Sequence, residues 1–163
     1  MSKSVASRAT VAPLAWLPLG GIVLGSLDIL FAVAFWSTRD VTATRIFQSV
    51  ASGVLGNASY SGGVATAWLG AGLHYFIATM MVVVYYLAGR RSGKLVRRPV
   101  AFGLPYGLLL YGVMNFVVLP LSAAGLPRFD NIPWVAGSVV MHMVFGVTCA
   151  LFARSALEAR GHR

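Results

Sequence analysis

Four long apolar stretches make up most of this chain and limit what it can fold into. They cover residues 14–36, 64–88, 100–121 and 134–154. A helix needs about 20 apolar residues to cross a hydrocarbon core about 30 Å thick, and each stretch meets that length. A bilayer admits only structures whose backbone polar groups are satisfied internally. The sequence therefore predicts an all-α fold: an integral membrane four-helix bundle in which residues 1–163 form a single membrane domain.

The composition supports a membrane protein, and the distribution of charge predicts its orientation. Hydrophobic residues make up 58% of the chain and charged residues 10%, whereas about a quarter of a soluble domain is charged. The net charge of +9 could suggest nucleic-acid binding, but the basic residues separate by side instead. One side has Lys3, Arg8, Arg90, Arg91, Lys94, Arg97, Arg98, Arg154, Arg160 and Arg163, and the other has Arg39, Arg45 and Arg128. Because cytoplasmic loops carry the Lys/Arg excess, both termini and the 89–99 loop should be cytoplasmic.

The basic cluster in the 89–99 loop has two interpretations. Arg90, Arg91, Lys94, Arg97 and Arg98 act as a topology signal, or they also bind anionic lipid headgroups. Neither interpretation involves nucleic acid. The partners that the sequence predicts are the lipid bilayer and either further copies of the chain or a larger membrane complex.

The connection between the first two stretches contains an additional helix. Apolar residues recur there at helical spacing, at Ile46, Phe47, Val50 and Val54. This pattern predicts an amphipathic helix over about 43–55 that lies in the outer membrane interface, with a solvated loop as the alternative. Thr42 or Thr44 would cap its start, and Gly56 would end it.

Each apolar stretch carries one strongly polar residue, and the four lie at similar depth. They are Asp28, His74, Asn115 and His142. At about 1.5 Å rise per residue, all four fall about 9–15 Å from the outer boundary, so they could form one intramembrane polar layer. Each shares a helical stripe with small residues or with the supporting residues Tyr111 and Ser138, and small residues mark helix contacts in membranes. We therefore expect the layer to face the interior of the bundle.

This polar layer could stabilise helix packing or bind a proton. The first is interhelical hydrogen bonding, worth about 0.6 kcal/mol per contact in a membrane protein. In the second, Asp28 and a histidine share a proton in a low-dielectric site. Ionisable groups inside a membrane are candidate functional residues, so the layer could serve pH sensing, proton-coupled transport or a channel component.

A third interpretation is a haem- or metal-binding accessory subunit. His74 and His142 lie on helices that run in the same direction, which permits bis-histidine haem ligation. Methionines near them, such as Met141 and Met143, would suit copper. However, Met141 and Met143 sit on either side of His142 on a helix and cannot easily converge, and methionine in a bundle usually packs. The sequence therefore predicts no resident metal or cofactor, with haem or copper at His74 and His142 as the alternative.

Signatures of common enzymes are missing from the sequence. It has no Gly-x-Ser-x-Gly, Walker or His-Glu-x-x-His motif, and no span contains two carboxylates. We therefore expect a non-enzymatic protein without catalytic residues. Ala32-Val33-Ala34 resembles a signal-peptide cleavage site, but the preceding apolar run is longer than usual. The single Cys149 cannot form an intrachain disulfide.

Three segments carry a family resemblance: residues 45–56 (RIFQSVASGVLG), 72–78 (GLHYFIA) and 114–122 (MNFVVLPLS). They resemble segments of small uncharacterised bacterial inner-membrane proteins and, more distantly, of the YagU family, which has been linked to acid resistance. The resemblance spans about residues 20–155. It implies a multi-pass protein of the bacterial inner membrane, and it implies roles for His74, Asn115, Pro120 and His142. It implies no specific biochemical activity.

Overall fold

The computed structural model describes residues 12–161 and is entirely helical. The long helices are α1 (Trp16–Ser37), α3 (Gly63–Arg91), α5 (Pro99–Val113) and α7 (Ile132–Gly161). Between them lie η1 (Pro13–Ala15), α2 (Ala43–Leu55), η2 (Gly56–Tyr60), α4 (Gly93–Arg97), a π-helical turn η3 (Met114–Val118) and α6 (Leu119–Leu121). The predicted fold class, a four-helix membrane bundle with a shorter helix between the first two spans, is confirmed.

Four helical segments in residues 12–161 are long and apolar enough to cross a membrane. They are Pro13–Ser37, Gly63–Arg91, Pro99–Leu121 and Ile132–Arg160, and they contain 25, 29, 23 and 29 residues. Many large apolar side chains on them point outward, including Trp68, which is 74% exposed, and Leu109, Phe116 and Val140. Outward apolar side chains on such helices suit contact with lipid tails, and we conclude that this is a multi-span membrane protein.

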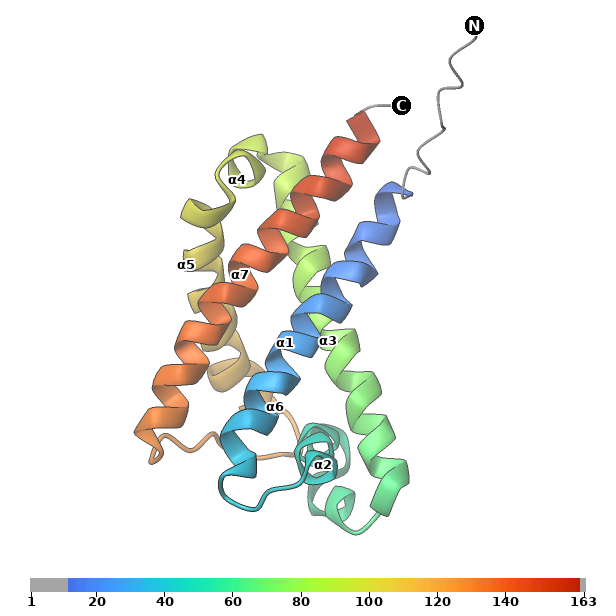
Figure 1. The fold of residues 1–163 in the computed structure, drawn as a ribbon, viewed down its shortest axis with the longest axis vertical. Helices are drawn as coiled ribbons and strands as arrows, with labels where there is room; N and C mark the ends of the chain where they lie inside the picture. The colour runs from blue at the N-terminus through green and yellow to red at the C-terminus, as the bar shows by residue number, and fades with distance from the viewer. Residues whose placement is uncertain (1–11, 162–163) are drawn as a thin grey trace, which may run out of the picture.

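The spans alternate in direction, and the segments that connect them lie at the two ends of the bundle (Figure 1). One end holds α2 and the connection from α6 to α7, and we call it the α2 end. The other holds α4, the start of α1 and the end of α7, and we call it the α4 end. The two ends of the bundle also differ in their content of basic residues. Among the described residues, Arg90, Arg91, Lys94, Arg97, Arg98, Arg154 and Arg160 belong to the α4 side, and Arg39, Arg45 and Arg128 to the α2 side.

Helices α5 and α7 pack backbone to backbone through glycines. A Cβ on Gly107 would collide with the backbone oxygen of His142, and one on Gly146 would collide with the backbone of Gly103 and Gly107. Small residues permit such close approach, which is a common source of helix association in membranes. The close contact fixes the height of His142 on α7 relative to α5.

Helix α2 packs against α3. Thr42 caps its start by accepting a hydrogen bond from the backbone nitrogen of Arg45, and Gly56 ends it with a positive φ of 57°. Gly70 lets the α3 backbone touch the carbonyl of Phe47. The side-chain nitrogen of Gln48 donates to the carbonyl of Gly63 at 3.0 Å. The helix is therefore a packed part of the bundle at its α2 end.

The interior differs between the two halves of the bundle. Toward the α4 end it is filled by a core that includes Val82, Tyr85, Phe145 and Cys149. Tyr106 crosses from α5 to α3 there, and its hydroxyl donates to the carbonyl of Met81 at 2.8 Å. Toward the α2 end, α3 diverges from α5 (Figure 1).

Candidate functional site

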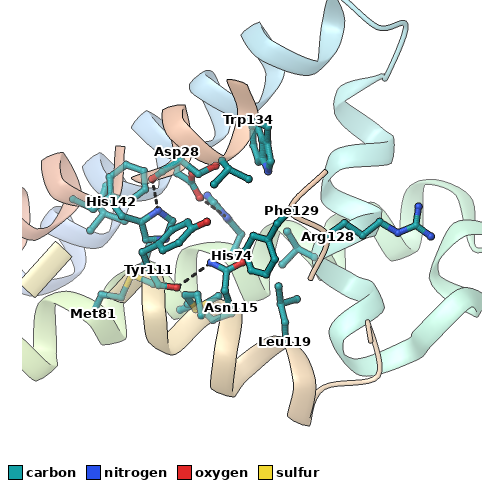
Figure 2. A pocket seen from close by; sticks show the side chains of 18 residues that line it. Asp28, His74, Met81, Tyr111, Asn115, Leu119, Arg128, Phe129, Trp134 and His142 are labelled. Carbon is teal, nitrogen blue, oxygen red and sulfur yellow. Dashed lines mark hydrogen bonds and ion pairs between the residues drawn. The ribbon is translucent and has the colours of Figure 1, made fainter. Parts of the chain in front are cut away.

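A cavity of about 260 Å³ occupies the α2 half of the bundle. All four spans contribute to it, together with α2 and the connection before α7. Its walls include every polar-layer and supporting residue that the sequence predicts: Asp28, His74, Tyr111, Asn115, Ser138 and His142. Figure 2 shows five of them gathered from different helices: Asp28, His74, Tyr111, Asn115 and His142. The fold thus gathers side chains that are up to 114 positions apart in the sequence.

His74 is held by a contact between α3 and α1. Its Nε2 lies 2.8 Å from the backbone carbonyl of Gly25. A carbonyl oxygen can only accept a hydrogen bond, so Nε2 carries its hydrogen. The other ring nitrogen, Nδ1, lies 3.9 Å from Oδ2 of Asp28. Helices α1 and α3 can approach this closely because residue 25 is a glycine. A Cβ at this position would collide with the ring of Tyr75.

His142 is held in the same manner on α7. Its Nδ1 lies 2.8 Å from the carbonyl of Ser138, one turn earlier, so Nδ1 is the donor and Nε2 has no hydrogen in the neutral ring. The ring of Tyr111 meets it edge to face, with the centroids 5.3 Å apart. Both histidines therefore use one nitrogen on a backbone carbonyl and keep the other for a further partner.

Asn115 sits in an irregular part of the third span. Its side-chain nitrogen donates to the carbonyl of Tyr111 at 2.9 Å, which leaves the side-chain oxygen as an acceptor. The surrounding turn is π-helical, and the backbone nitrogen of Leu119 bonds the carbonyl of Met114 five residues back. In that register the nitrogen facing the Asn115 carbonyl belongs to Pro120, which has no N–H. Such π turns often occur at functional sites.

Asp28 lies between this cavity and a second one. The second cavity, about 450 Å³, is lined by α1, α2, η2 and α7, and it shares Asp28, Val50, His74 and Trp134 with the first. The Asp28 side chain is 37% exposed, whereas that of His74 is 10% exposed. No Asp, Glu, Lys or Arg side chain is buried in the described part of the chain. The polar layer thus lies inside the bundle, but it is open to cavities and not sealed.

Several cavity residues gave no functional signal in the sequence. Trp134 lines both cavities and belongs to an aromatic cluster with Phe31, Phe35 and Trp36. Arg128 and Phe129 form part of the rim at the α2 end, and the Arg128 side chain extends away from the polar group (Figure 2). In the sequence, Arg128 lies in a loop and Trp134 at the start of a helix, which are common positions for topology signals and membrane-interface residues. Their position beside the cavity becomes visible only in the folded structure.

The arrangement offers no ready-made metal site. Within residues 12–161, no group of three or more His, Cys, Asp or Glu side chains is close enough to hold a metal ion. Met81 and Met114 line the cavity, whereas Met141 packs on the apolar core. The chemistry that the cavity does offer is proton exchange and hydrogen bonding by a carboxylate, two imidazoles, a phenol and an amide.

Searches of protein families, curated proteins and solved structures found no match to this chain. The family resemblance drawn from the three segments therefore stays a prediction.

Replacement of His74 by phenylalanine is expected to lower the stability of the bundle modestly, by about 1 kcal/mol. Phenylalanine keeps the ring but loses the bond to the Gly25 carbonyl, and interhelical hydrogen bonds in membranes contribute about 0.6 kcal/mol on average and 1.7 at most. Thermal unfolding in detergent measures the change. Tyr60→Phe, a ring substitution outside the first cavity, is the control. Unchanged unfolding of His74→Phe would mean that the contact does not stabilise the bundle.

Proposed function

We propose that this is a small non-enzymatic protein of the bacterial inner membrane whose Asp28–His74 pair binds a proton, so that its state follows the pH on the α2 side. The observation that carries the proposal is the fixed orientation of His74. With Nε2 committed to the Gly25 carbonyl, Nδ1 is the nitrogen that faces the Asp28 carboxylate 3.9 Å away.

This orientation of His74 favours the binding of one proton by the Asp28–His74 pair. When the ring is neutral and Asp28 is ionised, a lone pair on Nδ1 faces a negative charge, which is unfavourable. One added proton on Nδ1 turns this repulsion into attraction between the imidazolium and the carboxylate. The pair therefore favours a state with one more proton, and it loses that proton as the pH rises. Histidine is the side chain whose charge ordinarily changes between about pH 5 and 8.

The side that exchanges protons follows from the openings of the cavities. Exposed Arg128 and exposed Phe129 lie at the rim of the first cavity, and Arg45 lies at the second. Toward the α4 end the apolar core has Val82 and Cys149 at 0% exposure and Phe145 at 1%. The positive-inside rule assigns the Arg-rich α4 side, with both termini, to the cytoplasm and the α2 side to the exterior. The Arg90–Arg98 cluster then meets the anionic inner leaflet.

Proton-coupled transport is the second candidate function. The adjoining cavities at Asp28 support it, because they give a route from the α2 end to the centre of the site. The filled core beyond the site opposes it for a single rigid chain. Transport would need either a second conformation or assembly with further copies or a larger membrane complex, and the proton-binding site is common to both functions.

The proposal is tested by nitrogen NMR of ¹⁵N-histidine-labelled protein, with His74 assigned by comparison with His74→Phe. The chemical shift of each ring nitrogen reports whether it carries a hydrogen. We expect Nε2 of His74 to keep its hydrogen while Nδ1 gains one as the pH falls. In Asp28→Asn the proton should bind about tenfold more weakly or worse, because an opposite charge is lost.

Asp40→Asn is the matched control for that experiment. It removes one negative charge at the same end of the bundle, but Asp40 lines neither cavity. Its φ of 59° is one that asparagine adopts readily. The variant should titrate like the wild type. A His74 ring that never gains the second hydrogen, or that gains it identically in Asp28→Asn, would refute the proposal.

A further inference from the structure

We infer that the first cavity binds a small protonated amine, with Asp28 as its counter-charge, in competition with the proton. The inference rests on the proposed function, because it uses the same Asp28–His74 pair, and it adds the chemical class of ligand. Three properties of the cavity carry it: the sign of its charge, the kind of hydrogen-bonding atoms left free, and its size.

The free charge in the cavity is negative. Asp28 is the one acidic residue among the described residues that line either cavity. Two arginines also line them, Arg128 the first and Arg45 the second, and neither forms an ion pair with Asp28. Arg45 stacks on the ring of Tyr60, 3.7 Å from its centre, and Arg128 extends away from the polar group (Figure 2). The Asp28 side chain is 37% exposed, and no Lys or Arg among residues 12–161 is paired with it, so its carboxylate attracts a positive ligand.

The hydrogen-bonding atoms left free in the cavity are mainly acceptors. His74 and His142 each spend their one ring N–H on a backbone carbonyl, and Asn115 spends one of its two side-chain N–H groups in the same way. That leaves His74 Nδ1, His142 Nε2 and Asn115 Oδ1 without a hydrogen-bond partner among residues 12–161. Tyr111 and Ser138, which also line the cavity, have hydroxyl oxygens that can accept as well. None of these atoms is both fully buried and unpaired. Each is therefore open to a ligand, and a ligand with several donors can pair with them together.

Positive charge and several N–H donors together describe a protonated amine. A primary ammonium group has three donors and one charge, which matches a carboxylate surrounded by acceptors. A quaternary ammonium ion has the same charge without any N–H, so it would leave those acceptors unpaired. The inference is therefore specific to amines that carry N–H groups.

The size and the walls of the cavity limit the ligand to a short one. Its volume of about 260 Å³ lies just below the range of about 300–1,000 Å³ that holds drug-sized ligands. Beside the polar group the walls are apolar, with Leu24, Ile77, Met81, Met114 and Phe145. These side chains would surround a short alkyl chain while the ammonium group lies at Asp28.

An ammonium group at Asp28 must affect the proton. It would replace the added proton as the positive charge beside the carboxylate, and it would repel a second hydrogen on His74. The other groups that bear on this site are His142 on α7, Tyr111 on α5, Tyr75 on α3, Arg45 on α2 and Arg128 before α7. Amine and proton therefore compete, and each weakens the other by the same factor.

The test adds n-butylammonium to protein labelled with ¹⁵N in both histidine and tryptophan, with tetramethylammonium at the same concentration and ionic strength as the matched ligand. Saturating butylammonium is expected to weaken proton binding at His74 by about tenfold, the effect of a like charge nearby. It should also shift the indole nitrogen signal of Trp134, which lines the cavity. Tetramethylammonium, which has the charge but no N–H group, should produce clearly smaller changes in both.

Variants of the chain separate the contributions to amine binding. Asp28→Asn should abolish the butylammonium shift of Trp134, whereas Asp40→Asn should retain it. Asn115→Leu removes one acceptor without changing the charge, and it should weaken butylammonium binding by about tenfold. These two kinds of loss distinguish a site that uses both charge and hydrogen bonds from simple attraction of cations.

The outcomes for the amine and for the proton are distinguishable. If His74 titrates but neither ion affects it or Trp134, the amine inference is wrong and the proton proposal stands. Equal effects of both ions would also overturn the inference, because they would reflect charge alone. If butylammonium shifts Trp134 in an Asp28-dependent way while His74 does not titrate, the amine site is supported and the proton proposal fails. Absence of both responses overturns both.

Discussion

Asn115→Cys is expected to react rapidly with a water-soluble thiol reagent added from the α2 side, and not from the α4 side. Position 115 lines the first cavity and is half-buried. The cavity reaches the surface at the α2 end and is closed by the apolar core beyond it. Right-side-out and inside-out membrane vesicles present the two sides separately, so the rate of modification in each measures both access and orientation.

The chain supplies its own control for this labelling. The wild-type protein contains one cysteine, Cys149, with 0% exposure in the core. Wild type should therefore remain unmodified from either side while it is folded. The same core packing explains why a reagent that enters the cavity should stop there. Labelling of Cys149 in folded protein would show that the core opens, which would favour the transport function.

The charge of the reagent adds a second comparison. A methanethiosulfonate with a trimethylammonium group should modify Asn115→Cys about tenfold faster than one with a sulfonate group, because the Asp28 carboxylate raises the local concentration of cations. Adding Asp28→Asn should remove most of that preference. Modification from the α4 side alone, or no modification in folded protein, would contradict the one-sided cavity. Equal rates for the two reagents would contradict a negative site.

Much of the fold was predictable, because span length and hydropathy are local properties of the sequence. The apolar stretches specified the four spans. Of the two candidate caps for α2, Thr42 and Thr44, the structure uses Thr42, and Gly56 ends the helix as expected. The packing face of α2 was not predictable in this way. Val54, on the expected apolar face, is 62% exposed, whereas the polar Gln48 is buried with 5% exposure. In a membrane, apolar side chains can face lipid as well as protein, so an apolar stripe does not identify the packed side.

The candidate site was predictable in its members but not in its chemistry. Depth along each helix was enough to group Asp28, His74, Asn115 and His142. The roles of their individual atoms depend on how closely the helices approach. The donor on His74 is fixed by the carbonyl of Gly25, on a different helix and 49 positions away. The space between α3 and α5 likewise results from packing and has no signature in the sequence.

The site depends on close packing elsewhere in the bundle, which leads to a second large expected effect. Gly107→Val should destabilise the protein by about 3 kcal/mol, at the upper end of overpacking substitutions. Even a Cβ at this position would collide with the carbonyl of His142 and approach the Cα of Met143 to 2.6 Å. Backbone atoms cannot rotate away as a side chain can, so α5 and α7 would have to separate.

Gly112→Val is the matched control, since Gly112 lies on the same helix and has no atom within 4 Å of an added Cβ. It should change stability by about 0.5 kcal/mol or less, as is usual for surface substitutions. Unfolding in detergent compares the two variants. Gly107→Ala should fall between them, because it adds the colliding Cβ but no branches. Similar stability of all three would mean that α5 and α7 are not packed backbone to backbone, and the position of His142 beside Tyr111 would then lose its structural basis.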